Sequence, residues 1–255
     1  MGFRKLTIIS TFSILLLYGI IIISVFFYFD GQAMVDSFTN RRIINAITNS
    51  LYAATLATIL ASALAIPAAY ALSRFSFPLK FWVDTFLEFP LIVSPAALGA
   101  MLLIFFQTPA GSFITENIVD FVFVFAGIVL AQFVTIIGIS TRLMKAVYDE
   151  VPKRYEQVAR TLGASHQKAF LTVTFPLAKK GLISTVILTW AKAVGEFGAT
   201  ITLAGSMPMK TETLPTAIFM RLSVADIEGT VVLILILLGI SLSLLIVTRL
   251  LLLRK

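Results

Sequence analysis

The chain has no cysteine and only one histidine, His166, among its 255 residues. Disulfides, thiolate metal sites and metal sites built from several histidines are therefore excluded. No G-x-x-x-x-G-K-[ST] loop occurs, so any ATP hydrolysis must be carried out by another chain. Charge is also scarce, because 13% of the residues are charged and 58% are apolar. We expect a membrane protein with no catalytic residue, metal or cofactor of its own.

Long uncharged runs dominate the sequence. A helix needs about 20 mostly apolar residues to cross a bilayer, and continuous rather than alternating runs indicate helices. Pro90 and Pro95 predict a bend or a broken start in the third run. The fold class is thus an all-α membrane protein with about six transmembrane helices. The predicted spans are residues 6–29, 43–73, 89–115, 121–141, 181–207 and 229–248.

The predicted domain organisation is a single unit, residues 1–255. Residues 1–42 are expected to form an N-terminal span and an outer loop, and residues 43–255 a five-helix core. Across the predicted loops, 15 of the 20 Lys and Arg residues fall on the side of the termini and four on the other side. The positive-inside rule then places both termini in the cytoplasm of a multi-pass cell-membrane protein. The net charge of +7 sets this orientation and the contact with membrane lipid, and we expect no nucleic acid partner.

The longest charged gap, residues 142–180, contains a short amphipathic segment between Pro152 and Gly163. Its apolar residues recur at i, i+3, i+4 and i+7 and form one stripe. A helix this short is not stable alone in water, so its own bundle or a partner must hold it. A helix lying on the inner leaflet without a partner remains an alternative. The stripe consists of Tyr155, Val158, Ala159 and Leu162.

The predicted fifth span carries two charges, Lys192 and Glu196, in one i+4 row that continues to Thr200. A charge at membrane depth is costly, so both residues are expected to pair or to face a cavity. Two interpretations stay open: an internal pair that fixes helix packing, or a polar pathway lining in which Lys192 favours a passing dianion. An adjacent row of small residues would let another helix approach closely. The pathway and packing candidates are Lys192, Gly195, Glu196, Gly198 and Thr200.

The stretch from Tyr155 to Pro176 resembles the cytoplasmic signature of permease subunits of binding-protein-dependent ABC importers. That signature is Glu-Ala-Ala, three residues, Gly, nine residues and Ile-x-Leu-Pro, and its spacing fits here although Gln157 replaces the glutamate. In that family the helix docks into a cleft on the ATPase subunit. The resemblance implies a type I importer-like fold with a coupling segment at residues 149–177. The implied coupling residues are Tyr155, Glu156, Gln157, Val158, Ala159, Leu162, Gly163, Val173 and Pro176.

A second stretch, Trp190–Ile218, contains GEFGAT and TLP and resembles molybdate/tungstate permeases, a pattern that sulfate permeases largely share. The resemblance implies the membrane subunit of an ATP-driven oxyanion importer. The implied partners are a second copy, two ATP-binding subunits holding ATP and Mg, and an external oxyanion-binding protein. Two alternatives remain: a stand-alone secondary carrier or channel using Lys192 and Glu196, and a structural scaffold with no pathway.

Overall fold

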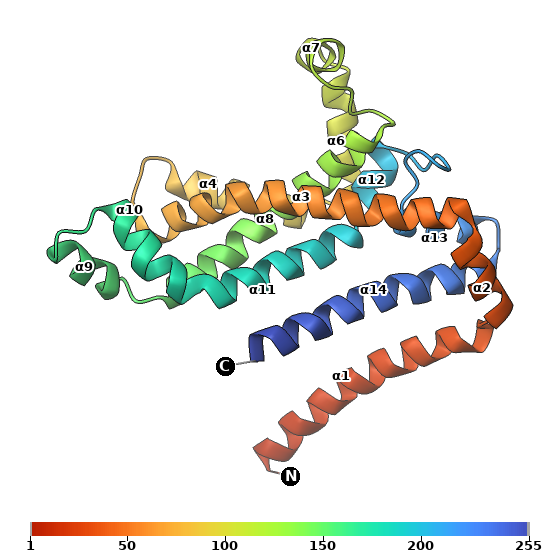
Figure 1. The fold of residues 1–255 in the computed structure, drawn as a ribbon, viewed down its shortest axis with the longest axis horizontal. Coiled ribbons are helices and arrows are strands. Elements are labelled where there is room, and N and C mark those ends of the chain that lie inside the picture. The colour runs from red at the N-terminus through yellow and green to blue at the C-terminus, as the bar shows by residue number, and fades with distance from the viewer. Residues whose placement is uncertain (1, 254–255) are drawn as a thin grey trace.

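The computed structural model describes residues 2–253, with side chains as far as Ile246, and its regular elements are all helices. The predicted all-α membrane fold is confirmed (Figure 1). Five helices are long and apolar enough to cross a membrane, and one bent pair would make a sixth span. The five are Phe3–Tyr28, Arg41–Arg74, Phe125–Glu150, His166–Val194 and Ile227–Ile246.

Three helices form the centre of the bundle: α3 (Arg41–Arg74), α8 (Phe125–Glu150) and α11 (Phe175–Val194). Helices α3 and α8 run toward the same end of the molecule, and α11 returns (Figure 1). The buried face of α3 is mostly alanine, which lets the neighbouring helix backbones approach closely. Its fully buried alanines are Ala53, Ala54, Ala57, Ala61, Ala65 and Ala69.

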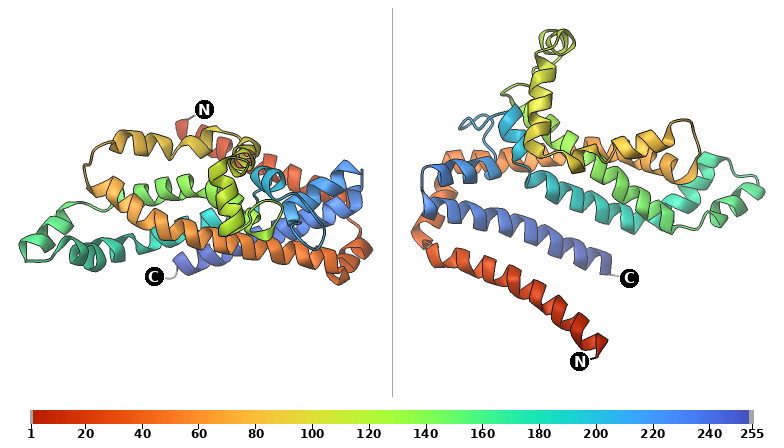
Figure 2. Two further views of the ribbon diagram at one scale, coloured as in Figure 1. Left: turned by 90° about the horizontal axis from the view of Figure 1, so that it is seen from above. Right: turned by 180° about the vertical axis from the view of Figure 1, so that it is seen from behind.

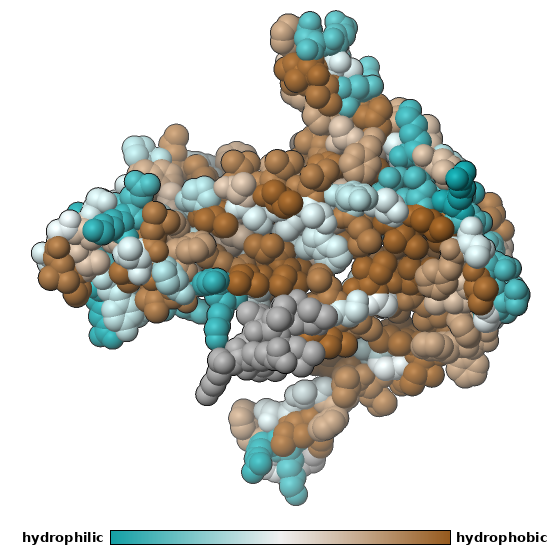
Figure 3. Space-filling view, viewed as in Figure 1, coloured by the Kyte–Doolittle hydropathy of each residue, from teal (hydrophilic) through white to brown (hydrophobic). Residues whose placement is uncertain are grey.

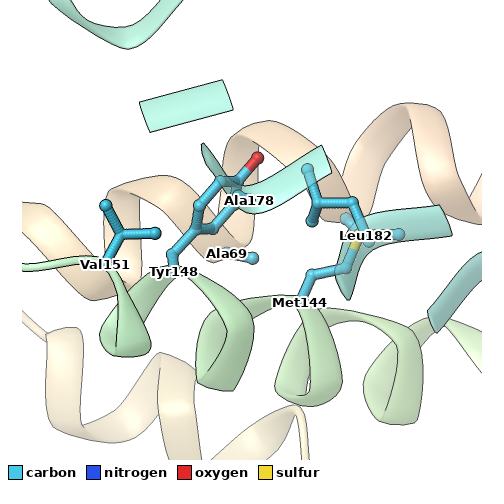
Figure 4. Packing of buried hydrophobic residues seen from close by; sticks show 7 residues of the cluster. Ala69, Met144, Tyr148, Val151, Ala178 and Leu182 are labelled. Carbon is cyan, nitrogen blue, oxygen red and sulfur yellow. The ribbon is translucent and has the colours of Figure 1, made fainter. Parts of the chain in front are cut away.

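A larger apolar cluster closes one end of this bundle. Tyr148 and Met144 of α8 point toward Ala69 of α3 and toward Ala178 and Leu182 of α11 (Figure 4). All five side chains are almost completely buried. The cluster fixes the three helix ends relative to one another, directly beside the segment that carries the short amphipathic helix.

The terminal helices lie to one side of the bundle. Helix α1 (Phe3–Val25) continues into the 3-10 turn η1 (Phe26–Tyr28), and α2 (Gly31–Thr39) leads into α3. The chain returns through α13 (Leu214–Ser223) and α14 (Ile227–Leu253). Helix α1 buries none of its residues and is apolar all round, as expected of a span covered by lipid or by a partner. Helix α14 contacts η1 and α2, and from there α1 and α14 diverge toward their free ends (Figure 2).

The predicted third span is not one helix. Helices α4 (Lys80–Phe86) and α5 (Phe89–Ile92) are followed by α6 (Pro95–Phe106), which turns away by 109°, and by α7 (Pro109–Asn117). The bend or broken start predicted from Pro90 and Pro95 is confirmed, and the bounds differ from the predicted 89–115, because the bent pair covers Lys80–Ile92 and Pro95–Phe106. The hydroxyl of Ser94 accepts a hydrogen bond from the N–H of Ala97 (3.3 Å), so a new helix begins there. Helix α6 projects away from the bundle (Figure 2).

The predicted fifth span begins earlier and breaks earlier than expected. Helix α10 (His166–Ala169) and the π-helical turn η2 (Phe170–Thr174) lead directly into α11, which ends at Val194. A separate helix, α12 (Gly198–Leu203), follows the break. The continuous helix predicted at 181–207 is therefore wrong, and α8 runs on to Glu150 instead of ending near residue 141.

The surface divides into zones along the bundle. Hydrophobic residues cover much of its middle, whereas hydrophilic residues gather at the end with α9 (Arg154–Thr161) and at the opposite end near α2 and α13 (Figure 3). The N-terminus of α1 and the last turns of α14 point toward the α9 end (Figure 1). This distribution fits a chain that crosses the membrane along the long axis of the bundle.

Candidate functional site

The short amphipathic segment forms helix α9, between the end of α8 and the start of α10. Its C-terminal turn depends on Gly163, whose φ of +89° is in the left-handed region that glycine adopts without steric cost. The N–H of Ala164 then bonds to the carbonyl of Ala159 (3.0 Å). The hydroxyl of Ser165 accepts from the N–H of Lys168 (3.2 Å) and caps α10. The helix end predicted at Gly163 is therefore confirmed.

The apolar stripe of α9 faces away from the bundle. Tyr155 is 42% exposed, Val158 57% and Leu162 84%. Ala159 is half-buried, and Gln157 is exposed beside the stripe. The chain's own bundle therefore does not cover the stripe, although the sequence left that possibility open. An apolar face presented at a hydrophilic end of the molecule is typical of a docking surface.

Glu156, one of the implied coupling residues, is the side chain of α9 that turns inward. It is 8% exposed. One carboxylate oxygen accepts from Arg74 Nε (2.8 Å) and from the Thr174 hydroxyl, and the other accepts from the Tyr70 hydroxyl (3.1 Å). Burial alone would raise the pKa of Glu156, but the hydrogen bonds from Thr174, Arg74 and Tyr70 outweigh it and hold the pKa below its ordinary value.

The second half of the predicted coupling signature lies in η2 and the start of α11. Val173 is half-buried within the π-helical turn, and Pro176 is exposed in the first turn of α11. Thr174, between them, is fully buried and donates to Glu156. The spacing between the two halves of the signature thus brings α9 and η2 together through one hydrogen bond.

The internal pair of Lys192 with Glu196, one of the two interpretations left open, does not form. Glu196 is 2% exposed, whereas Lys192 is exposed, and no ion pair joins them. The helix ends at Val194, so the i, i+4 geometry is lost. A carboxylate oxygen of Glu196 instead accepts from the N–H of Ala199 (3.0 Å) at the first turn of α12. Gly195 is exposed at the break, and Thr200 is fully buried in α12.

Gly198 has a packing role at the crossing of α6 and α12. A Cβ atom on Gly198 would lie 2.8 Å from the backbone nitrogen of Ala96. On the opposite side of the crossing, a Cβ on Gly99 would lie 2.7 Å from the carbonyl oxygen of Ala199. Only glycine allows two backbones to approach this closely. The broken third and fifth spans are therefore held against each other.

An ion pair at the opposite end of the molecule was missed by sequence analysis. Arg42, at the start of α3, donates two hydrogen bonds to Glu212 (2.7 and 2.6 Å), whose side chain is 1% exposed. Asn49 of α3 also donates to the carbonyl of Glu212 (3.1 Å). These contacts fasten the loop after α12 to α3. The two partners lie 170 residues apart, so no local pattern could have indicated them.

Comparison with known proteins gives consistent results. The family model described as "Binding-protein-dependent transport system inner membrane component" matches residues 61–255. The chain is 35% identical to the Molybdenum transport system permease protein ModB of Escherichia coli over 68% of this chain and 77% of that protein. It is 34% identical to a probable molybdenum ABC transporter permease protein of Haloferax volcanii over 93% and 86%.

A sulfate permease and a solved structure are also similar. The Sulfate transport system permease protein CysT of Salmonella typhimurium is 31% identical over 75% of this chain and 70% of that protein. A chain of a bacterial ABC transporter that imports alginate superposes with a TM-score of 0.73, covering 99% of this chain and 95% of that one at 17% identity. At this identity the superposition concerns the fold alone.

Proposed function

Since the chain belongs to the family of binding-protein-dependent transport system inner membrane components, we propose that it forms the translocation pathway of an ATP-driven importer for a tetrahedral oxyanion. Family membership makes it a permease subunit of an ABC importer, a multi-pass protein of the inner membrane. Molybdate or tungstate is the proposed substrate, because two relatives that are 35% and 34% identical to this chain are molybdenum permeases. Sulfate is the second candidate, supported by the similarity to a sulfate permease.

The outward apolar face of α9 is the observation that supports an ATP-driven mechanism. Tyr155, Val158 and Leu162 are exposed at a hydrophilic end of the molecule, while the carboxylate of Glu156 holds the opposite face of the helix. A face with this shape and chemistry suits a cleft on a separate ATPase subunit. Because Gln157 stands where the signature has glutamate, docking depends on the apolar stripe more than on a carboxylate.

The proposed assembly contains two copies of this chain, two ATP-binding subunits and an external oxyanion-binding protein. ATP and Mg are held by the ATP-binding subunits, because this sequence has no phosphate-binding loop. Both termini and α9 then lie in the cytoplasm, where the excess of Lys and Arg belongs. The binding protein meets the opposite end, which includes the loop fastened by Arg42 and Glu212.

The transport cycle follows from this arrangement. When the ATPase subunits close on ATP, they draw the two α9 helices together, and the bundles attached to them open the pathway toward the outside. High affinity for the oxyanion belongs mainly to the external binding protein. In this chain, Lys192 is a candidate for attracting the passing dianion, because it is exposed and is not neutralised by Glu196.

The docking proposal is tested with the double variant Val158→Glu/Leu162→Glu. Two carboxylates on the stripe should lower the affinity for the ATPase subunit by about tenfold or more, since one apolar anchor at an interface contributes about 2 kcal/mol. Co-purification of a tagged ATPase subunit from membranes measures the loss. Gln157→Glu is the matched control, because it adds a carboxylate to the same helix beside the stripe and should keep the complex. A double variant that retains the ATPase at the wild-type level would overturn the docking assignment.

A further inference from the structure

Helix α9 is attached to its own bundle through Glu156. Of the eight residues of α9, Glu156 alone is buried, and its three hydrogen-bond donors belong to two other elements. Tyr70 and Arg74 come from the last turns of α3, and Thr174 comes from η2. The carboxylate of Glu156 therefore links α9 to the end of α3 and to η2.

Arg74 also donates hydrogen bonds to two other parts of the chain. Its Nε donates to Glu156 (2.8 Å), its Nη2 to the carbonyl of Val151 (2.7 Å) and its Nη1 to the hydroxyl of Ser73 (3.2 Å). The Arg74 side chain is 4% exposed. The planar guanidinium is always charged and offers donors in fixed directions, which a lysine cannot reproduce. One buried cation thus joins α9, the linker after α8 and the end of α3.

The contacts continue across α8 to the third span. The Ser73 hydroxyl donates to Asp149 of α8 (2.5 Å). One turn earlier on α8, Lys145 lies 3.9 Å from Asp149 and 3.6 Å from Asp84 of α4. A second ion pair, between Arg142 of α8 and Glu88, runs parallel to this one. The inner ends of α9, α3, α8 and α4 are therefore connected by side chains.

We propose that Glu156 and Arg74 form a joint that converts movement of α9 into movement of the ends of α3 and α8, and that Lys145 and Asp84 extend it to α4. In this role they are positioning residues, since they contact neither oxyanion nor nucleotide. The ATPase subunit moves α9 through the outward apolar stripe, and the inward carboxylate of Glu156 passes this movement to the ends of α3 and α8. This inference rests on the proposed function, because it requires an ATPase subunit docked on α9.

The test uses the reconstituted importer with Glu156→Gln. The docking face is unchanged in this variant, so the ATPase subunit should still co-purify and hydrolyse ATP at its basal rate. Stimulation of hydrolysis by the oxyanion-loaded binding protein should fall about tenfold, within the usual range of coupling between distant sites. Glu150→Gln is the matched control, since Glu150 is exposed at the end of α8 and should leave stimulation unchanged. Wild-type stimulation in Glu156→Gln would overturn the joint, and so would loss of the ATPase subunit from that variant alone.

A milder variant guards against simple misfolding. Tyr70→Phe removes one donor to Glu156 without leaving a buried charge unpaired, so it should reduce stimulation less than Glu156→Gln and keep the basal rate. Unchanged stimulation in Tyr70→Phe together with a complete loss of protein in Glu156→Gln would assign Glu156 to folding only and overturn the proposal. If wild-type chain also fails to bind the ATPase subunit, the proposed function fails rather than the joint.

The extension to α4 is tested with a double-mutant cycle, because spatial connection alone does not demonstrate coupling. Lys145→Met should lower stimulation, and adding it to Glu156→Gln should lower it no further if both act in series. If the two variants instead lower stimulation independently, so that their effects multiply, the extension to α4 is overturned. The joint between α9 and α3 would remain.

Discussion

At the scale of single residues, buried charges at both ends of the bundle join segments that are distant in the sequence. Glu212 fastens the loop after α12 to Arg42, and Glu156 fastens α9 to Arg74. In both pairs the carboxylate is almost completely buried and accepts more than one hydrogen bond. Removing the arginine would leave a buried charge without its partner, which is more damaging than removing an exposed pair.

Replacement of Arg42 by alanine should destabilise the chain. Glu212 would stay buried without a charged partner, at a cost of about 2 kcal/mol, an amount typical of an unsatisfied buried group. For a chain of this length that corresponds to a fall of roughly 4–8 °C in the melting temperature. Thermal unfolding of the purified protein in detergent measures it. Arg41→Ala changes the exposed neighbouring arginine and should leave the melting temperature unchanged; an equal fall in both variants would contradict the role given to the ion pair.

The attachment of α9 to the bundle should weaken at acid pH. Because the folded pKa of Glu156 is lowered below 4.5, the carboxylate stabilises the attachment fully above pH 4.5, and this contribution is lost as the pH falls through the lowered pKa. The chain has no cysteine, so Thr161→Cys provides a single site for a fluorescent probe on α9. Probe mobility should rise below pH 4.5 in this chain. With Glu156→Gln added, mobility should be high at neutral pH and independent of pH; identical profiles would count against Glu156 as the attachment.

Lys192 offers a prediction about the pathway. Lys192→Met should lower oxyanion uptake several-fold without weakening the ATPase complex, because the variant removes an exposed cation that Glu196 does not neutralise. Uptake of isotope-labelled molybdate into vesicles is the measurement. Lys179→Met removes an exposed cation near the other end of α11 and serves as the control. Equal uptake by the two variants would exclude a pathway role for Lys192.

At the scale of elements, the two broken spans meet where α6 crosses α12. Gly99→Ala should perturb this crossing by about 1–3 kcal/mol, as overpacking usually does, because the new methyl group would lie 2.7 Å from a backbone oxygen. Thermal stability and uptake should both fall. Gly239→Ala, where a Cβ meets nothing within 4 Å, is the matched control. A Gly99→Ala protein with wild-type stability would show that the backbones can separate freely.

Sequence patterns specified the elements that depend on local composition. The first, second and sixth spans follow from uncharged runs, and the end of α9 follows from Gly163. The break at Gly195 was not predicted, because the small residues around it fit a continuous helix equally well. The cap that Glu196 provides is a local contact, with the N–H of Ala199 three residues on, but a glutamate in this position also fits the i+4 row of a continuous helix. Likewise, an amphipathic pattern cannot tell which face of a short helix turns inward, and the partner that decides it, Arg74, lies 82 residues away.

At the scale of the whole molecule, the chain presents surfaces that its own fold leaves uncovered. Helix α1 is exposed along its full length, and the stripe of α9 faces outward. Both fit a subunit that works within an assembly in the membrane. The central claim is that this assembly imports an oxyanion using ATP hydrolysed by another chain, rather than acting alone as a carrier or channel.

The most direct measurement is uptake of labelled molybdate into proteoliposomes that contain this chain, the partner ATPase subunit and the binding protein. We expect uptake with all three proteins and ATP, and none when either the ATPase subunit or ATP is omitted. Sulfate uptake in place of molybdate would change the substrate but keep the mechanism. Uptake by this chain alone, without the ATPase subunit, would contradict the account and establish a stand-alone carrier or channel.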